Sequence, residues 1–183
     1  MITSSANPRL KAIRKLRERK ERQASQLFYV EGLRPVIEAV QLKVDIETII
    51  YSPDLLTSEI GRKAIVRAKA LNYEMLETSA QVFKSLSLKE DPQGIAAVAR
   101  QRWLELDEVE IKSGELWVAL VEVADPGNLG TILRTLDAVG GKGVILLDHS
   151  TDPYDPSAIR ASMGAVFSLN ITKTSLDSFS SWK

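Results

Sequence analysis

Residues 116–147 read LWVALVEVADPGNLGTILRTLDAVGGKGVILL, with two apolar runs separated by a loop and an amphipathic segment. The run at 116–123 is apolar almost throughout, which is typical of a central parallel strand covered on both faces. A glycine-bearing loop at 125–130 precedes a helix predicted over 131–139, and a second buried strand is predicted over 144–147. Strand, loop, helix and strand form a βαβ unit, in which ligands favour the carboxyl ends of the strands.

The loop at 125–130 differs from two common phosphate-binding loops. It lacks the G-x-G-x-x-G pattern, and G-x-x-x-x-G-K-[ST] occurs nowhere in the chain. Its chemistry lies in Asn128 and in Arg134 of the following helix. An amide donates and accepts hydrogen bonds, and a guanidinium offers a rigid fork to phosphate or ribose oxygens. Spacing alone also allows Asn128 to be a helix cap and Arg134 to be a surface charge.

Strands and helices also alternate in the first half of the chain. Strands are predicted over 27–30, 47–51, 73–76 and 95–99, with helices over 35–42, 58–71 and 79–86. This order predicts an α/β layer architecture with parallel pairing. Residues 100–115 are acidic and lack an apolar period, which indicates a linker. The expected division is a first domain over 1–101, a linker over 102–114 and a second domain over 115–183.

Charge is unevenly distributed along the chain. Overall, 24 lysines and arginines balance 24 aspartates and glutamates, so the net charge is zero. Residues 1–22 hold eight of these cations and two glutamates, a net +6 that leaves −6 for the remainder. Asn7-Pro8 predicts the start of a helix. Leu10, Ile13 and Leu16 form one narrow apolar face of this helix, so its basic residues cover the remaining surface. Three interpretations stay open: a solvated surface helix, a contact to nucleic-acid phosphates, and an arginine-rich transit peptide.

Composition narrows the chemistry further. The 183 residues include no cysteine, which excludes disulfides, thiolate metal sites and cysteine nucleophiles, and fits a reducing compartment such as the cytoplasm. No apolar run approaches the roughly 18 residues that a bilayer-spanning helix needs. His149 is the single histidine, and we interpret it as a loop residue, so no metal site is predicted.

Residues 121–147 closely resemble the first signature of the SpoU/TrmH branch of the SPOUT RNA methyltransferases. The Arg-x-Ser-x-Gly-Ala segment that follows in this family is similar to residues 160–165. The first half resembles the family's substrate-binding domain, itself similar to a ribosomal protein, at residues 7–9, 28–32 and 92–94. The core of the first signature, Asn-Leu-Gly-x-x-x-Arg-Thr, is met by Asn128, Leu129, Gly130, Arg134 and Thr135.

This resemblance implies a ribosomal-protein-like α/β substrate-binding domain followed by part of a knotted, parallel-sheet SPOUT domain. It implies methyl transfer from S-adenosylmethionine to a ribose 2′-hydroxyl of ribosomal or transfer RNA, by a homodimer with its active site at the subunit interface. By family analogy, Arg134 is the base-like residue and Asn128 orients it or the ribose. Because arginine stays protonated, stabilising the developing alkoxide or a neighbouring phosphate is the simpler role physically. The expected RNA-binding residues are Arg9, Lys11, Arg14, Arg17, Lys20, Arg160 and Ser162.

Two further family signatures, a Gly-x-Glu-x-x-Gly loop and a Ser-Leu-Asn segment before a closing helix, are absent from the sequence. The tripeptide Ser168-Leu169-Asn170 is not that second signature, because it directly follows the Arg-x-Ser-x-Gly-Ala segment and is interpreted as the next strand. Because the two together form the knotted cofactor pocket, we expect a C-terminally truncated member with little of that pocket, and no cofactor-binding residue is assigned. The leading hypothesis is an RNA 2′-O-ribose methyltransferase. The alternative is a non-catalytic RNA-binding protein or inactive fragment that retains the scaffold. A dinucleotide-binding oxidoreductase is disfavoured because its glycine fingerprint is missing.

Overall fold

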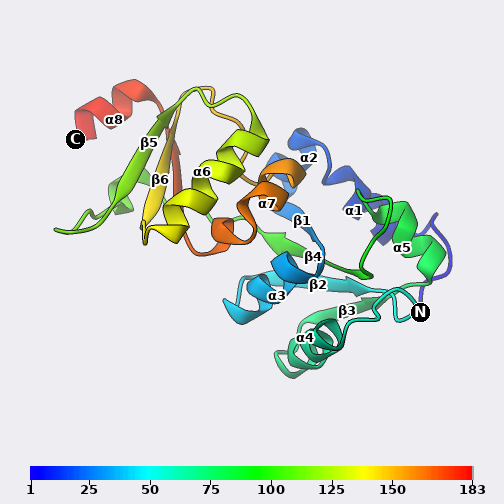
Figure 1. Ribbon diagram of the computed structural model, residues 1–183. Helices are drawn as coiled ribbons and strands as arrows, with labels where there is room; N and C mark the ends of the chain where they lie inside the picture. The colour runs from blue at the N-terminus through cyan, green and yellow to red at the C-terminus, as the bar shows by residue number, and fades with distance from the viewer. Residues whose placement is uncertain (183) are drawn as a thin grey trace. The chain divides into compact units, whose positions relative to one another are not determined.

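The structure is a computed structural model that describes residues 1–182, and the chain forms two compact units (Figure 1). The first unit is Met1–Gln101, and the second begins at Arg102. The mixed α/β class predicted from the sequence is confirmed in both units. No helix within residues 1–182 is long and apolar enough to cross a membrane.

The first unit contains a four-stranded sheet in the order β1-β4-β2-β3. β2 and β3 are parallel, as predicted, but β4 is antiparallel to both β1 and β2. Tyr51 at the end of β2 pairs with Glu77 at the end of β3 and with Ile95 at the start of β4. The chain therefore re-enters the sheet at the end where β3 stops, which reverses its direction. The strands are β1 (Leu27–Glu31), β2 (Ile46–Tyr51), β3 (Glu74–Glu77) and β4 (Ile95–Arg100).

Five helices surround this sheet, and side-chain caps begin three of them. Asn7, Ser58 and Ser79 accept backbone hydrogen bonds at the starts of α1, α4 and α5. Leu10 of α1 and Phe83 of α5 pack in one core cluster with sheet residues such as Ile50. The helices are α1 (Pro8–Lys15), α2 (Arg19–Ser25), α3 (Leu33–Gln41), α4 (Glu59–Ala70) and α5 (Ala80–Leu86).

The basic N-terminal segment forms two helices instead of the single helix predicted. A turn over residues 16–18 separates α1 from α2, and Leu16 is buried there. The side chain of Arg22 is also buried, 1% exposed, and its Nη1 donates to the carbonyl oxygens of Leu16 at 2.9 Å and Arg17 at 2.8 Å. The prediction failed because an apolar repeat does not show that a buried arginine satisfies backbone carbonyls at a helix break.

The second unit contains a three-stranded sheet in the order β5-β6-β7, with every pair parallel. This confirms the predicted βαβ unit. β6 is buried throughout, whereas β5 lies at the edge and Val121 is 53% exposed. The prediction of a central strand covered on both faces is wrong for residues 1–182, because β5 pairs with β6 alone and its side chains are half-buried or exposed. The elements are β5 (Trp117–Val121), α6 (Pro126–Ala138), β6 (Gly143–Leu147), α7 (Pro156–Ser162), β7 (Asn170–Thr174) and α8 (Leu176–Trp182).

Residues 102–114, predicted to be a linker, pack in the second unit. The backbone N–H of Leu104 donates to the carbonyl of Ile171 in β7 at 2.9 Å, and Val109 is buried. The hydroxyl of Tyr154 donates to the carbonyl of Arg102 at 2.6 Å and accepts from the Arg102 N–H at 2.9 Å. Burial raises the pKa of Tyr154 to about 12, so this hydroxyl stays protonated at neutral pH. Tyr154 therefore has a structural role.

Candidate active site

The loop after β5 leads directly into α6, which begins at Pro126, five residues earlier than predicted. Asp125 is the N-cap residue, and its Oδ1 accepts a hydrogen bond from the backbone N–H of Asn128 at 2.6 Å. Asn128 is therefore a first-turn helical residue with an exposed side chain, and it is not the cap. The signal was present in the sequence, since aspartate before proline is a common way to begin a helix.

The core of the motif, residues 128–135, presents two different faces. Leu129 and Leu133 are completely buried. A Cβ atom at Gly130 would lie 2.5 Å from the carbonyl oxygen of Ala158 and 2.7 Å from the Cβ of Ala161, so α6 meets α7 at backbone distance. Asn128 and Arg134, in contrast, are exposed. Half of the motif is thus required for helix packing, and the other half is available for chemistry.

Asn128 and Arg134 do not contact each other in the structure. Six residues of helix separate them, which corresponds to about 9 Å along the axis and about 120° around it. No hydrogen bond or ion pair within residues 1–182 holds the Arg134 guanidinium. For both side chains to contact one substrate atom, the long Arg134 side chain would have to swing toward Asn128; otherwise the substrate must span this distance.

The second predicted segment, residues 160–165, ends α7 and divides in the same way. Arg160 is exposed, whereas Ser162 is 1% exposed and its hydroxyl donates to the carbonyl of Ile159 at 2.9 Å. Met163 and Gly164 then adopt left-handed backbone conformations that end the helix. Ser162 was expected to contact RNA, but its hydroxyl is buried and donates a hydrogen bond within the second unit. We therefore keep Arg160 alone from this segment as a candidate for RNA contact.

An open hollow of about 710 Å³ lies at the carboxyl ends of β5, β6 and β7. Glu122 and Asp148 directly follow β5 and β6, and both take left-handed backbone conformations with φ of 49° and 54°. The Asp148 carboxylate also accepts from the backbone N–H of Leu176 at the start of α8. This is the edge at which the βαβ order predicts a ligand. The lining residues are Glu122, Asp148, His149, Lys173, Thr174 and Ser175.

Two families match the chain, one in each unit. Residues 7–97 match the MRM3-like substrate binding domain, and residues 115–182 match the SpoU rRNA Methylase family. The crystal structure of an rRNA methyltransferase from Sinorhizobium meliloti is 36% identical, has a TM-score of 0.88, and aligns over 99% of this chain and 67% of its own. The chain belongs to the SpoU rRNA methylase family.

Two curated relatives of this SpoU-family chain are named as 23S rRNA 2'-O-methyltransferases. A 23S rRNA (uridine(2479)-2'-O)-methyltransferase of Streptomyces viridochromogenes is 30% identical, over 84% of this chain and 53% of the relative. A 23S rRNA (guanosine(2553)-2'-O)-methyltransferase of Bacillus subtilis is 29% identical, over 97% of this chain and 66% of the relative. The chain therefore spans between about half and two thirds of the length of these two relatives.

The Sinorhizobium meliloti protein also has a crystal structure with AdoMet bound, with a TM-score of 0.87 and 36% identity to the SpoU-family chain. The hollow at the carboxyl ends of β5, β6 and β7 is the place to test for such a cofactor. All six of its lining side chains are polar or charged, and within residues 1–182 none of them forms an apolar slot for an adenine ring. These residues do not enclose the whole cofactor. The same part of the chain contains no cluster of three or more metal-ligating side chains.

Five of the predicted RNA-binding residues, all from the basic N-terminal run, lie in the unit that matches the substrate binding domain, and the three arginines among them hold structural partners. Arg9 pairs with Glu74 at 2.5 Å, and Arg14 donates to the carbonyl of Ser5. Arg17 donates to the carbonyls of Leu86 at 2.7 Å and Ser87 at 3.1 Å, at the end of α5. These arginines fasten the N-terminal helices to the rest of the first unit.

The exposed lysines of α1 and α2 behave differently. Lys11, Lys15 and Lys20 are exposed, and within residues 1–182 none of them makes an ion pair or hydrogen bond. Arg19 is also exposed, and its side chain makes no ion pair or hydrogen bond within residues 1–182. Lys11 and Lys20 were predicted as RNA contacts, whereas Lys15 and Arg19 were not. The charges in the sequence do not distinguish these four exposed cations from the arginines that form hydrogen bonds or ion pairs within the first unit.

Proposed function

We propose that this SpoU-family chain takes part in the S-adenosylmethionine-dependent methylation of a ribose 2′-hydroxyl in ribosomal RNA. The observation that carries the proposal is the exposure of Asn128 and Arg134 within the SpoU-matching region, while Leu129, Gly130 and Leu133 between them are buried. The two curated relatives described above are named for this reaction on 23S rRNA.

The roles proposed for the chain's own residues follow from their chemistry. S-adenosylmethionine supplies the methyl group when bound. Because an arginine guanidinium stays protonated, Arg134 stabilises the negative charge that develops on the ribose oxygen, or binds a neighbouring phosphate. Asn128 donates and accepts hydrogen bonds, and it orients the ribose hydroxyl. Alignment of the reacting oxygen is a large part of such catalysis, because the reaction is an in-line displacement.

An Arg134→Ala variant tests the catalytic assignment. We expect the rate of methyl incorporation into ribosomal RNA to fall by about 10²- to 10³-fold, because the variant removes a charged donor that faces the developing oxyanion. The free energy of unfolding should stay within about 0.5 kcal/mol, since the exposed side chain holds no partner. Arg67→Ala, an exposed arginine of α4, is the matched control and should keep full activity. Unchanged activity in Arg134→Ala would remove this residue from the mechanism.

We further propose that RNA phosphates contact the exposed cations of α1 and α2. Lys11, Lys15, Arg19 and Lys20 are not engaged elsewhere, so they can form ion pairs with phosphate at little structural cost. Arg9, Arg14 and Arg17 hold the fold, and their contribution to RNA binding is secondary. Arg160 is a separate candidate for RNA contact in the second unit.

We also propose that the chain acts as a homodimer in the cytoplasm. The support is the family resemblance, which implies a dimer, and the exposed apolar side chain of Val121 on the edge strand β5. Light scattering coupled to gel filtration tests the dimer. RNA binding without any methyl transfer would favour the alternative function, that of a non-catalytic RNA-binding protein.

A further inference from the structure

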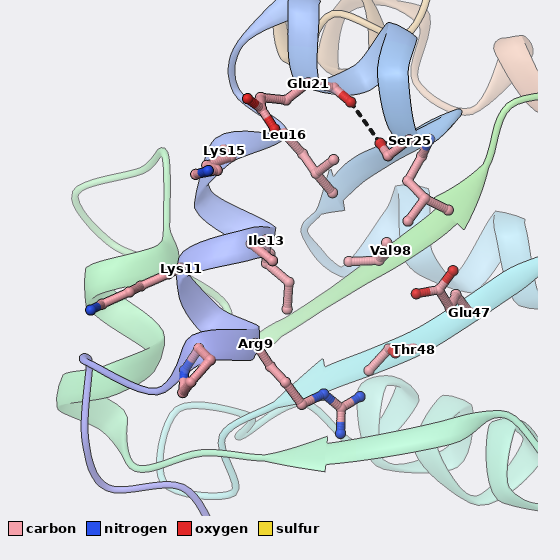
Figure 2. Close-up of a pocket in the computed structure, with 13 residues that line it drawn as sticks. Arg9, Lys11, Ile13, Lys15, Leu16, Glu21, Ser25, Glu47, Thr48 and Val98 are labelled. Carbon is pink, nitrogen blue, oxygen red and sulfur yellow. Dashed lines mark hydrogen bonds between the residues drawn. The ribbon is translucent and has the colours of Figure 1, made fainter.

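A preformed apolar groove lies between the two N-terminal helices and the sheet of the first unit (Figure 2). Its volume is about 550 Å³. Ile13 and Leu16 of the helical segment face Val98 of β4 across the groove, and Leu27 of β1 adds a further apolar surface. Val98 and Leu16 are buried, whereas Ile13 and Leu27 are half-buried. The core cluster thus reaches solvent at this groove.

Polar contacts hold the elements at both ends of the groove. At one end, Arg22 donates to two carbonyls of the turn between α1 and α2. At the other end, Glu74 accepts hydrogen bonds from Arg9 at 2.5 Å and from the Thr48 hydroxyl at 3.0 Å. A preformed site loses less conformational entropy when a ligand binds, so a groove tied in this way is suited to binding.

The charged side chains around the groove limit the kinds of ligand that it can bind. Glu21 and Glu47 contribute hydrogen-bond acceptors to the lining, although Glu47 is already paired with Arg100 at 3.3 Å. The ammonium groups of Lys11 and Lys15 extend from α1 away from the apolar surface (Figure 2). A ligand that uses all of these groups needs a flat apolar body, a hydrogen-bond donor on its edge, and an anionic chain that crosses α1. An unpaired nucleotide has each of these parts. A base inside a duplex does not, because stacking and pairing hide its faces and its edge.

We infer that this groove binds one unpaired nucleobase of the RNA substrate, with the flanking phosphates on Lys11 and Lys15. The inference rests on the proposed function, since it assumes that the first unit binds RNA. It adds that the RNA is recognised at a single-stranded position, and that a base with an exocyclic amino group is favoured by the Glu21 carboxylate.

The test fills the groove without changing its charge. Ala12 is exposed and lines the groove, so Ala12→Trp places an indole where the base is inferred to lie. Ala24→Trp adds the same side chain to an exposed site of α2 outside the groove and is the matched control. Dissociation constants are measured at one salt concentration for a 12-nucleotide RNA, as a single strand and annealed to its complement.

We expect Ala12→Trp to weaken binding of the single strand by about tenfold, and to change binding of the duplex much less. Ala24→Trp should change neither. In the unsubstituted chain, 2-aminopurine placed in the single strand should also change its emission on binding, because it enters an apolar site. This second measurement decides the question even if Ala12→Trp fails to fold.

The outcomes separate this inference from the proposed function. If the unsubstituted chain bound neither form of the RNA, both would be overturned. If it bound RNA, but Ala12→Trp left the ratio of the two dissociation constants unchanged, the groove assignment alone would be overturned. Unchanged 2-aminopurine emission at saturation would overturn it as well, and would leave the groove as a surface for an apolar protein segment.

Discussion

Two groups of arginines in this chain differ in whether their side chains already hold hydrogen-bond partners. In the N-terminal helices, Arg17 and Arg22 donate to backbone carbonyls at helix ends and so hold secondary structure together. In α6, Arg134 is exposed and, within residues 1–182, has no hydrogen-bond or ion-pair partner. The first group is concentrated in a conspicuous basic run, whereas Arg134 stands alone in a helix of modest charge.

This difference shows that the density of positive charge is a poor guide to function. A carbonyl group at a helix end needs a donor, and an arginine in a basic run satisfies that need as readily as it binds phosphate. The informative property is whether a cation is already engaged. By that criterion, we expect Arg134 and the exposed lysines of α1 and α2 to bind ligands, and each experiment below tests this division between engaged and exposed cations.

The largest effect is expected for Arg22→Met. Two backbone carbonyls, of Leu16 and Arg17, would lose their donor inside a buried site, so the free energy of unfolding should fall by about 2–4 kcal/mol. Arg19→Met, at an exposed position of the same helix, should change it by less than about 0.5 kcal/mol. The measurement is urea denaturation followed by far-UV circular dichroism.

Tryptophan fluorescence provides an internal control for this experiment. All three tryptophans, Trp103, Trp117 and Trp182, lie in the second unit. The circular dichroism transition of Arg22→Met should therefore shift more than the fluorescence transition. Equal destabilisation by Arg22→Met and Arg19→Met would show that the engaged and exposed arginines of α2 do not differ.

An intermediate effect is expected for the double variant Lys11→Ala/Lys15→Ala. Each lysine that contacts a phosphate adds about one to the slope of log affinity against log salt, so the slope should become shallower by about two. The free energy of unfolding should hardly change, since these lysines hold no partner. Lys84→Ala/Lys112→Ala removes the same charge from exposed positions elsewhere. If both double variants gave the same slope, α1 would not be part of the RNA interface.

The smallest effect concerns the ion pair between Arg9 and Glu74. Hydrogen bonds from Arg9 and then from Thr48 lower the pKa of the Glu74 carboxyl below its usual value. The folded state therefore gains stability above the ordinary glutamate pKa and loses it as the pH falls through the lowered one. Because the pair is exposed, this contribution should be below about 1 kcal/mol.

Glu74→Gln tests that contribution. We expect the variant to be slightly less stable at neutral pH and to lose less stability than the unsubstituted chain between neutral pH and about pH 3. Thermal unfolding at a series of pH values measures the difference. Glu90→Gln, an exposed glutamate outside the pair, is the control and should follow the unsubstituted chain. Parallel pH profiles for all three proteins would contradict a role for the pair.

Several elements of the fold followed from local sequence. The apolar runs of β1, β2, β4 and β6 and the presence of helices at α4 and α5 were identified correctly, because burial leaves direct patterns in the residues. The start of α6 was missed although Asp125-Pro126 marks it. The direction of β4 was not accessible, since an apolar run is the same read in either direction.

The sequence by itself determined the α/β class, the concentration of positive charge in residues 1–22 and the motif that contains Asn128 and Arg134. The tertiary structure alone decided which of these charged residues are available to a ligand. Arg17 is engaged because residues 86 and 87, distant in the chain, end a helix beside it. Lys11 and Lys15 are not engaged because no acceptor within residues 1–182 reaches them. Hydrogen-bond partners are set by proximity in space, which spacing along the chain does not record.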